Sequence, residues 1–168
     1  MKTQFVESTE TVELVPHILH PKKILVPVDF SDTSQQAFQY ALRFAEQFGC
    51  EIVLLHGVEP ESVIAGAPAA TDVFAQPEED TIAAKAELEA LVASSRNRPS
   101  SIRLKVRTGH APNEINKVAK DLDIDLIIIA THGYTSWRHL CIGSTAERVV
   151  RTAPCPVLVV REKEHEFI

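Results

Sequence analysis

The sequence predicts a single α/β domain built on a doubly wound, mostly parallel five-stranded sheet flanked by about four helices. Short apolar runs alternate with longer segments of helical periodicity, and turn residues follow each run. A strand and a helix recur four times before a last strand, which indicates right-handed crossovers with helices on both faces. The chain has 168 residues, of which 45% are hydrophobic and 24% charged, and this balance suits one globular domain.

The first half of the pattern begins with residues 22–28, KKILVPV, a short apolar run that enters the turn-rich stretch DFSDTS. Such a run is typical of a strand buried on both faces. A helix follows and ends at Gly49, a residue suited to a helix C-terminus. Its apolar positions recur at helical spacing: Ala37, Ala41, Phe44, Ala45 and Phe48. Residues 50–58, CEIVLLHGV, form the second predicted strand.

A long loop is predicted next, because residues 59–77 carry three prolines and a glycine. A loop of this length could act as a lid or an interface element. A helix begins at Glu78, with Ala84, Leu88, Leu91 and Val92 on one stripe. Residues 102–108, IRLKVRT, alternate apolar and charged side chains, which predicts a strand near the edge of the sheet.

The last part of the chain contains two helices and two strands. Pro112 suits the first turn of the third helix, whose apolar stripe is Ile115, Val118, Ala119 and Leu122. The stretch DLIIIA is the most apolar strand, and we expect it to be central. The fourth helix begins at Ser144 and ends near Ala153, before the sequence PCP, and VLVV is the last strand.

Composition and motifs exclude several kinds of protein. The net charge of −6 argues against non-specific binding to nucleic acid or an anionic membrane. The longest aliphatic runs are too short to span a bilayer, and the N-terminus lacks the apolar run of a secretory signal, so we expect a cytoplasmic protein. The three cysteines are widely spaced and form no zinc or redox motif. We predict a flexible arm over residues 1–21, the domain over 22–161 and a tail over 162–168.

The stretch ATHGYTSWRHLCIGSTAER, residues 130–148, lies between the fourth predicted strand and the fourth helix. The first amides and the dipole of that helix suit a phosphate, Gly143 leaves the backbone accessible, and Ser144 and Thr145 offer hydroxyl groups. However, Ser144 and Glu147 also match a capping box, in which Ser144 only caps its own helix. Both readings stay open, since a capped helix can still direct amides at an anion. No Walker A or dinucleotide glycine motif is present.

Over residues 22–161 the sequence resembles the universal stress protein family. The similarity is carried by KKILVPVDFSDTSQQAFQYALRFA near the start and GSTAERVVRTAPCPVLVV near the end. Nucleotide-binding members carry the pattern Gly-x2-Gly-x9-Gly-Ser or -Thr. Gly133 and Gly143-Ser144 match it, whereas Ala130 replaces the first glycine. The resemblance implies a Rossmann-like fold of the adenine nucleotide alpha hydrolase type, with ATP or AMP as ligand.

The resemblance also implies a role for individual residues. Asp29 would hold the ribose hydroxyls or the adenine edge, and Gly57 stands where relatives carry a small aliphatic wall against adenine. Ala130 ends a strand, where an alanine is tolerated, and adds one methyl group near the ribose or phosphate. The full set of implied nucleotide-binding residues is Pro27, Val28, Asp29, Gly57, Ala130, His132, Gly133, Gly143, Ser144 and Thr145.

Metal and catalytic sites are weakly indicated. The spacing of His132, His139 and Cys141 matches no standard zinc site. Asp29 and Asp32 together could hold Mg²⁺ beside a triphosphate, although an aspartate at position 32 is also suited to capping a helix. No nucleophile–base pair is evident, so we expect at most weak ATP hydrolysis.

Three functions are compatible with these observations. The first is a cytoplasmic stress-response module that senses an adenine nucleotide with little or no turnover. The second is a dimeric interaction or scaffold protein that has lost nucleotide binding. Ala130 and Gly57 are the evidence for this function. The third is a slow ATPase.

Assembly is predicted from the last strand, which offers an apolar edge made of Val157, Leu158, Val159 and Val160. We expect it to pair with the same strand of a second copy across a two-fold axis, as the resemblance also implies. The alternative is that residues 1–20 fold back over this edge and keep the chain monomeric.

Overall fold

A computed structural model describes residues 20–59, 77–95, 101–131 and 142–161. The chain alternates strands and helices throughout these ranges. In chain order the elements are β1 (Lys23–Val28), α1 (Asp32–Phe48), β2 (Glu51–Val58), α2 (Pro77–Ser94), β3 (Ile102–Thr108), α3 (Ala111–Asp121), β4 (Leu126–Ala130), α4 (Ser144–Thr152) and β5 (Val157–Val160). Most of the predicted N-terminal arm, the loop after β2 and the C-terminal tail lie outside the described residues.

The five strands form one sheet in the order β3-β2-β1-β4-β5, and every neighbouring pair is parallel. The predicted doubly wound α/β fold is therefore confirmed, and β3 and β5 are its edges. The expected central place of the DLIIIA strand needs correction, because β4 is interior but β1 occupies the middle. Both positions bury a strand on two faces, so apolar content alone does not distinguish them.

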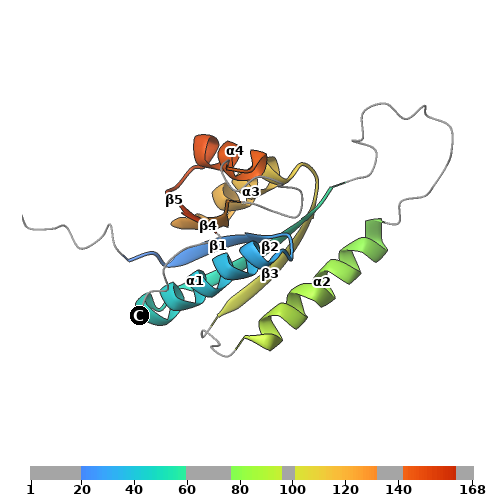
Figure 1. The fold of residues 1–168 in the computed structure, drawn as a ribbon, viewed down its shortest axis with the longest axis horizontal. Coiled ribbons are helices and arrows are strands. Elements are labelled where there is room, and N and C mark those ends of the chain that lie inside the picture. Colours follow the sequence, from blue (N-terminus) through green and yellow to red (C-terminus); the bar gives the residue numbers. More distant parts are fainter. Residues whose placement is uncertain (1–19, 60–76, 96–100, 132–141, 162–168) are drawn as a thin grey trace, which may run out of the picture.

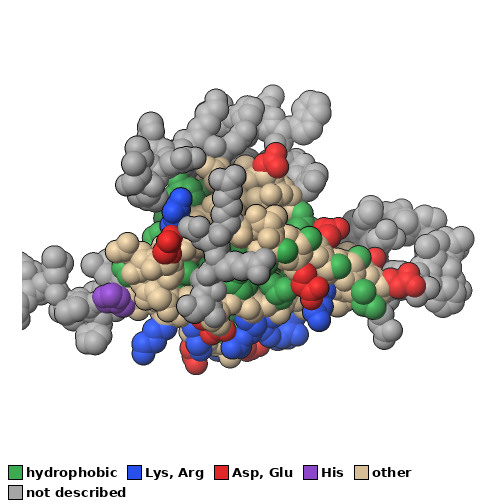
Figure 2. Space-filling model, turned by 90° about the horizontal axis from the view of Figure 1, so that it is seen from below, with side chains coloured by type: hydrophobic (Ala, Val, Ile, Leu, Met, Phe, Trp, Pro, Cys, Tyr) green, Lys and Arg blue, Asp and Glu red, His purple; other side chains and the backbone are tan. Residues whose placement is uncertain are grey.

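Helices cover both faces of the sheet, with α1 and α2 on one side and α3 and α4 on the other (Figure 1). Alternate residues of β1 enter the two cores: Ile24 and Val26 pack with Phe38 of α1, whereas Leu25 packs with Val118 and Val149. All six side chains are at most 1% exposed. The outside of the α1 and α2 side, seen from below in Figure 2, carries acidic, basic and apolar side chains in small groups.

The ends of α1 follow from its flanking residues. Ser31 is the N-cap, because its side chain accepts a hydrogen bond from the N–H of Ser34. The suggested capping role of Asp32 is therefore wrong: Asp32 is the first helical residue, where its charge favours the helix dipole. At the other end Gly49 adopts φ +69°, the left-handed conformation predicted for it.

The helices within residues 20–59, 77–95, 101–131 and 142–161 are α1, α2, α3 and α4. None of the helices in these ranges is both long enough and apolar enough to cross a membrane.

Candidate functional site

A cavity lies where the strand order reverses, at the carboxyl ends of β1, β2 and β4 and beside the first turns of α3 and α4. Parallel α/β sheets bind ligands at this kind of switch point. The cavity is lined by Pro27, Val28, Asp29, Ser34, Leu55, Gly57, Ala111, Glu114, Ile115, Ile129, Ala130, Thr131, Gly143, Ser144, Thr145 and Ala146. The stretches after the first and fourth strands meet here.

Asp29 follows β1 and is held by the turn that starts α1. Its carboxylate oxygen Oδ1 accepts hydrogen bonds from both the N–H, at 3.1 Å, and the hydroxyl of Ser31. The N–H of Asp29 lies 3.4 Å from the hydroxyl oxygen of Ser34, and that hydroxyl donates to the carbonyl of Ser31. These bonds orient a half-buried carboxylate at the wall of the cavity.

The N-terminus of α4 forms another wall. Gly143 is its N-cap with φ −60° and ψ 151°, and it has no side chain that could cap the helix. The first N–H bonded within the helix is that of Glu147, which donates to the carbonyl of Gly143 at 2.9 Å. The N–H groups of Ser144, Thr145 and Ala146 therefore have no acceptor inside the helix and stand at its positive end.

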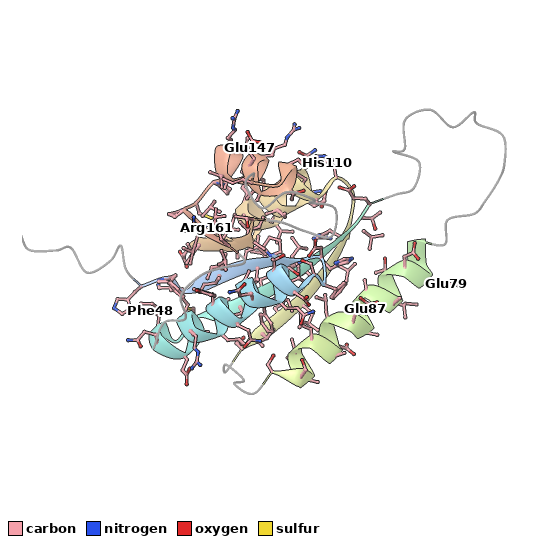
Figure 3. All side chains as sticks on the ribbon, viewed as in Figure 1. Phe48, Glu79, Glu87, His110, Glu147 and Arg161 are labelled. Carbon is pink, nitrogen blue, oxygen red and sulfur yellow. The ribbon has the colours of Figure 1, made fainter. Side chains whose placement is uncertain are left out.

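The capping box proposed for Ser144 and Glu147 is wrong. Ser144 is already the first helical residue, so its side chain does not occupy the N-cap position. Glu147 lies on the outer side of α4 (Figure 3) and pairs instead with Arg151, one turn further on, at 2.8 Å. The N-cap lies one residue earlier than the capping box would place it, because Gly143 takes the extended backbone conformation that an N-cap requires.

β2 and α3 form a further part of the lining, which is apolar except for Glu114. Leu55 and Gly57 line the cavity together with Ala111 of α3, a helix that begins after His110 (Figure 3). A Cβ atom added at Gly57 would lie 3.8 Å from the Cβ of Ala111, an ordinary van der Waals distance. The wall at Gly57 therefore has room for a small side chain.

Eight of the ten predicted nucleotide-binding residues line this cavity: Pro27, Val28, Asp29, Gly57, Ala130, Gly143, Ser144 and Thr145. His132 and Gly133 lie outside the described residues, as do His139 and Cys141. Asp32 is exposed and is not among the residues that line the cavity. Within the described ranges, no three His, Cys, Asp or Glu side chains form a group that could hold a metal ion.

Sequence reasoning missed eight lining residues, which lie in β2, β4, α1, α3 and α4 and directly after β4. These are Ser34, Leu55, Ala111, Glu114, Ile115, Ile129, Thr131 and Ala146. Their patterns predicted only helix and strand faces. The convergence of strand ends at one edge was the one available signal, and applied to the start of α3 it would have found Ala111 and Glu114.

Two cysteines lie at the opposite end of the strands, before β2 and before β5. Burial raises the pKa of the Cys50 thiol and of the Cys155 thiol above the usual value. Raised pKa values keep both groups in the unreactive thiol form at neutral pH.

Comparison with known proteins identifies the fold and the family. A sequence model of the universal stress protein family matches residues 20–161. The chain belongs to this family. Universal stress protein MJ0531 of Methanocaldococcus jannaschii is 32% identical over 145 residues, which span 86% of this chain and 85% of the relative.

Solved structures agree with this membership. That of MJ0577, also from Methanocaldococcus jannaschii, has a TM-score of 0.71 and 28% identity, and the match covers 86% of this universal stress protein and 98% of the other chain. A universal stress protein from Archaeoglobus fulgidus, solved in complex with dAMP, matches with a TM-score of 0.59 and 23% identity over 82% of this chain and 96% of that one.

Proposed function

We propose that this universal stress protein is a cytoplasmic stress-response module that binds an adenine nucleotide, ATP or AMP, with little or no turnover. The observation that carries the proposal is the pairing of two features in one cavity: an oriented carboxylate, Asp29, and a helix N-terminus capped by a glycine, Gly143. The first suits ribose hydroxyls, which donate hydrogen bonds, and the second suits phosphate oxygens, which accept them.

In this proposal the nucleotide extends across the ends of three strands. Its phosphates meet the N–H groups of Ser144, Thr145 and Ala146 and the hydroxyls of the first two. The ribose meets Asp29, and the base lies on the apolar wall that includes Leu55 and Gly57. His132 and Gly133 belong to the same proposed set through the family resemblance.

Electrostatics limit how the phosphates can be held. The charged residues among the described lining residues are Asp29 and Glu114, and both are acidic. Backbone amides and hydroxyls must therefore offset the phosphate charge within this part of the chain. Mg²⁺ would reduce the charge of a bound triphosphate, and we accordingly expect it to favour ATP binding more than AMP binding.

The known relatives support the ligand class without identifying the ligand. The Archaeoglobus fulgidus universal stress protein was solved with dAMP, an adenine nucleotide. Its 23% identity supports a shared fold, and in this chain the cavity at the strand ends offers groups suited to the same class of ligand.

Mass spectrometry of the small molecules released from freshly purified protein tests the proposal. We expect an adenine nucleotide from the wild-type protein and none from Gly143→Val, purified in parallel as the matched control. Recovery of the same molecule from both proteins would contradict the proposed site. If neither protein releases a nucleotide and neither binds one when it is added, the dimeric scaffold function takes its place.

We also propose that the protein forms a homodimer through β5. This strand is an edge of the sheet, and the carbonyls of Pro156 and Val160 accept hydrogen bonds from Ile127 and Thr131 on the β4 side. Residues alternate along a parallel strand, so the backbone groups of Val157 and Val159 face the free edge. An antiparallel pairing with a second β5 would satisfy these groups.

A further inference from the structure

Phe30, directly after Asp29, has an unusual backbone conformation. Its φ is +65°, in the left-handed region. Among the described residues, one other non-glycine residue, Asp123, has a positive φ, and aspartate tolerates this region far better than a bulky aromatic residue does. Strained conformations of this kind persist where surrounding contacts determine them, and they gather at functional sites.

The contact that holds Phe30 comes from His56 of β2. The two rings stack with centroids 4.5 Å apart and planes inclined by 31°. The ring of Phe30 also packs against the core between α1 and the sheet, and its carbonyl accepts a hydrogen bond from the side chain of Gln35 at 3.0 Å. Contacts with its ring and a hydrogen bond to its carbonyl therefore both hold Phe30 in place.

His56 also contacts the residue before Asp29. Its Nδ1 lies 2.9 Å from the carbonyl oxygen of Val28, and because a carbonyl only accepts, the imidazole donates this hydrogen bond. One imidazole thus holds Val28 by a hydrogen bond and Phe30 by stacking. Asp29, between them, has its carboxylate fixed by Ser31.

His56 lies on the other face of the sheet from the cavity. Leu55 and Gly57, its neighbours in β2, line the cavity, whereas His56 does not. Side chains alternate between the two faces of a strand, so the side chain of His56 points away from the cavity and would not contact a ligand bound there.

We infer that the His56–Phe30 pair is a positioning device that aims the Asp29 carboxylate at the ribose hydroxyls of a bound nucleotide. The inference rests on the proposed function and deepens it. His56 and Phe30 are positioning residues that act through Asp29, so their effect should be felt by the ribose hydroxyls and not by the phosphates or the base.

The test compares the affinities of ATP and 2′,3′-dideoxy-ATP, which lacks both ribose hydroxyls. We expect the wild-type protein to prefer ATP about tenfold, the value of one hydrogen bond to a charged group. Phe30→Gly and His56→Phe should each remove most of this preference by weakening ATP alone, and Asp29→Asn should do the same. Phe30→Tyr, which keeps the stacking ring, should retain it.

The variants separate positioning from folding. Phe30→Gly removes the ring but accepts the positive φ, and His56→Phe keeps an aromatic ring and removes only the hydrogen bond, so at least one variant should stay folded in thermal unfolding. The inference would be overturned if a folded variant lost affinity for ATP and 2′,3′-dideoxy-ATP equally, or if it kept the wild-type preference for ATP. Neither result would contradict nucleotide binding by the wild-type protein. Wild-type protein that binds neither ligand would overturn the proposed function, and the inference with it.

Discussion

The N–H of Gly143 donates a hydrogen bond of 2.7 Å to the carbonyl of Thr131, which joins the start of α4 to the end of β4. Thr131 is itself tied to β5, because its N–H donates to the carbonyl of Val160 at 2.9 Å. The amides proposed to hold phosphate are therefore fixed to the sheet. Changes at Gly143 should affect the ligand much more than the fold.

Replacing Gly143 with valine should abolish nucleotide binding and leave the protein folded. The backbone at Gly143 is extended, so valine can adopt it without backbone strain, and the less favourable N-cap should cost less than about 1 kcal/mol of stability. The isopropyl group would occupy space that phosphate oxygens need beside the first amides of α4. Binding of labelled ATP checks the expected loss of affinity, and thermal unfolding checks that the variant stays folded. A variant that binds ATP with wild-type affinity would show that the first amides of α4 do not hold the phosphates.

Replacing Ala130 with glycine should leave the nucleotide affinity equal or higher. Ala130 is 8% exposed and has no positive φ, so its methyl group is the only feature that separates it from the family's first glycine. We expect a loss of stability of roughly 0.5–1 kcal/mol, because glycine is more flexible in the unfolded chain. A clear fall in affinity, measured by titration, would show that the methyl group contacts the ligand favourably.

Replacing Gly57 with alanine should strengthen the apolar wall of the cavity. The added methyl group would meet Ala111 at 3.8 Å, so we expect stability to hold or rise and affinity for the nucleotide to be equal or higher. Gly49→Ala is the matched control: at φ +69° it should lower stability by roughly 1 kcal/mol. Destabilisation of Gly57→Ala as large as that of the control would mean that the cavity has no such room.

Replacing Val159 with proline should convert the proposed dimer to monomers. The N–H of Val159 faces the free edge of β5, so proline removes a bond across the interface while the pairing with β4 persists. Val159→Ala keeps that N–H and should remain dimeric, although it loses packing against the core on the α3 and α4 side. Light scattering on all three proteins gives their oligomeric states. A wild-type protein that is monomeric at tens of micromolar would contradict the dimer and favour the alternative in which residues 1–20 fold back over the edge of the last strand.

The elements were predictable because their signals are local. Apolar spacing marked α1 through residues such as Ala37 and Ala41, and Gly49 marked its end. The exact caps were not predictable, because DFSDTS offers several capping residues in a row and GS places a glycine before a serine. Which of them becomes the N-cap depends on where the strand before it ends, and this is decided by the whole sheet.

The candidate site was predictable where it follows a strand directly and where Gly143 precedes the first turn of α4. Asp29 and Ala130 stand at strand ends, so a parallel sheet must bring them to one edge. Glu114 lies in α3, the helix that connects β3 to β4, and no local sequence pattern relates it to Asp29. The positive φ of Phe30 was equally hidden, because no local pattern marks it, and the ring that Phe30 contacts, His56, lies 26 residues further along the chain.

Calorimetric titration of the wild-type protein with ATP and with AMP decides whether the cavity binds an adenine nucleotide. We predict saturable binding of at least one of them, with one nucleotide for each chain, and loss of that binding in Gly143→Val. Absence of saturable binding by either nucleotide to folded wild-type protein, with and without Mg²⁺, would contradict this prediction.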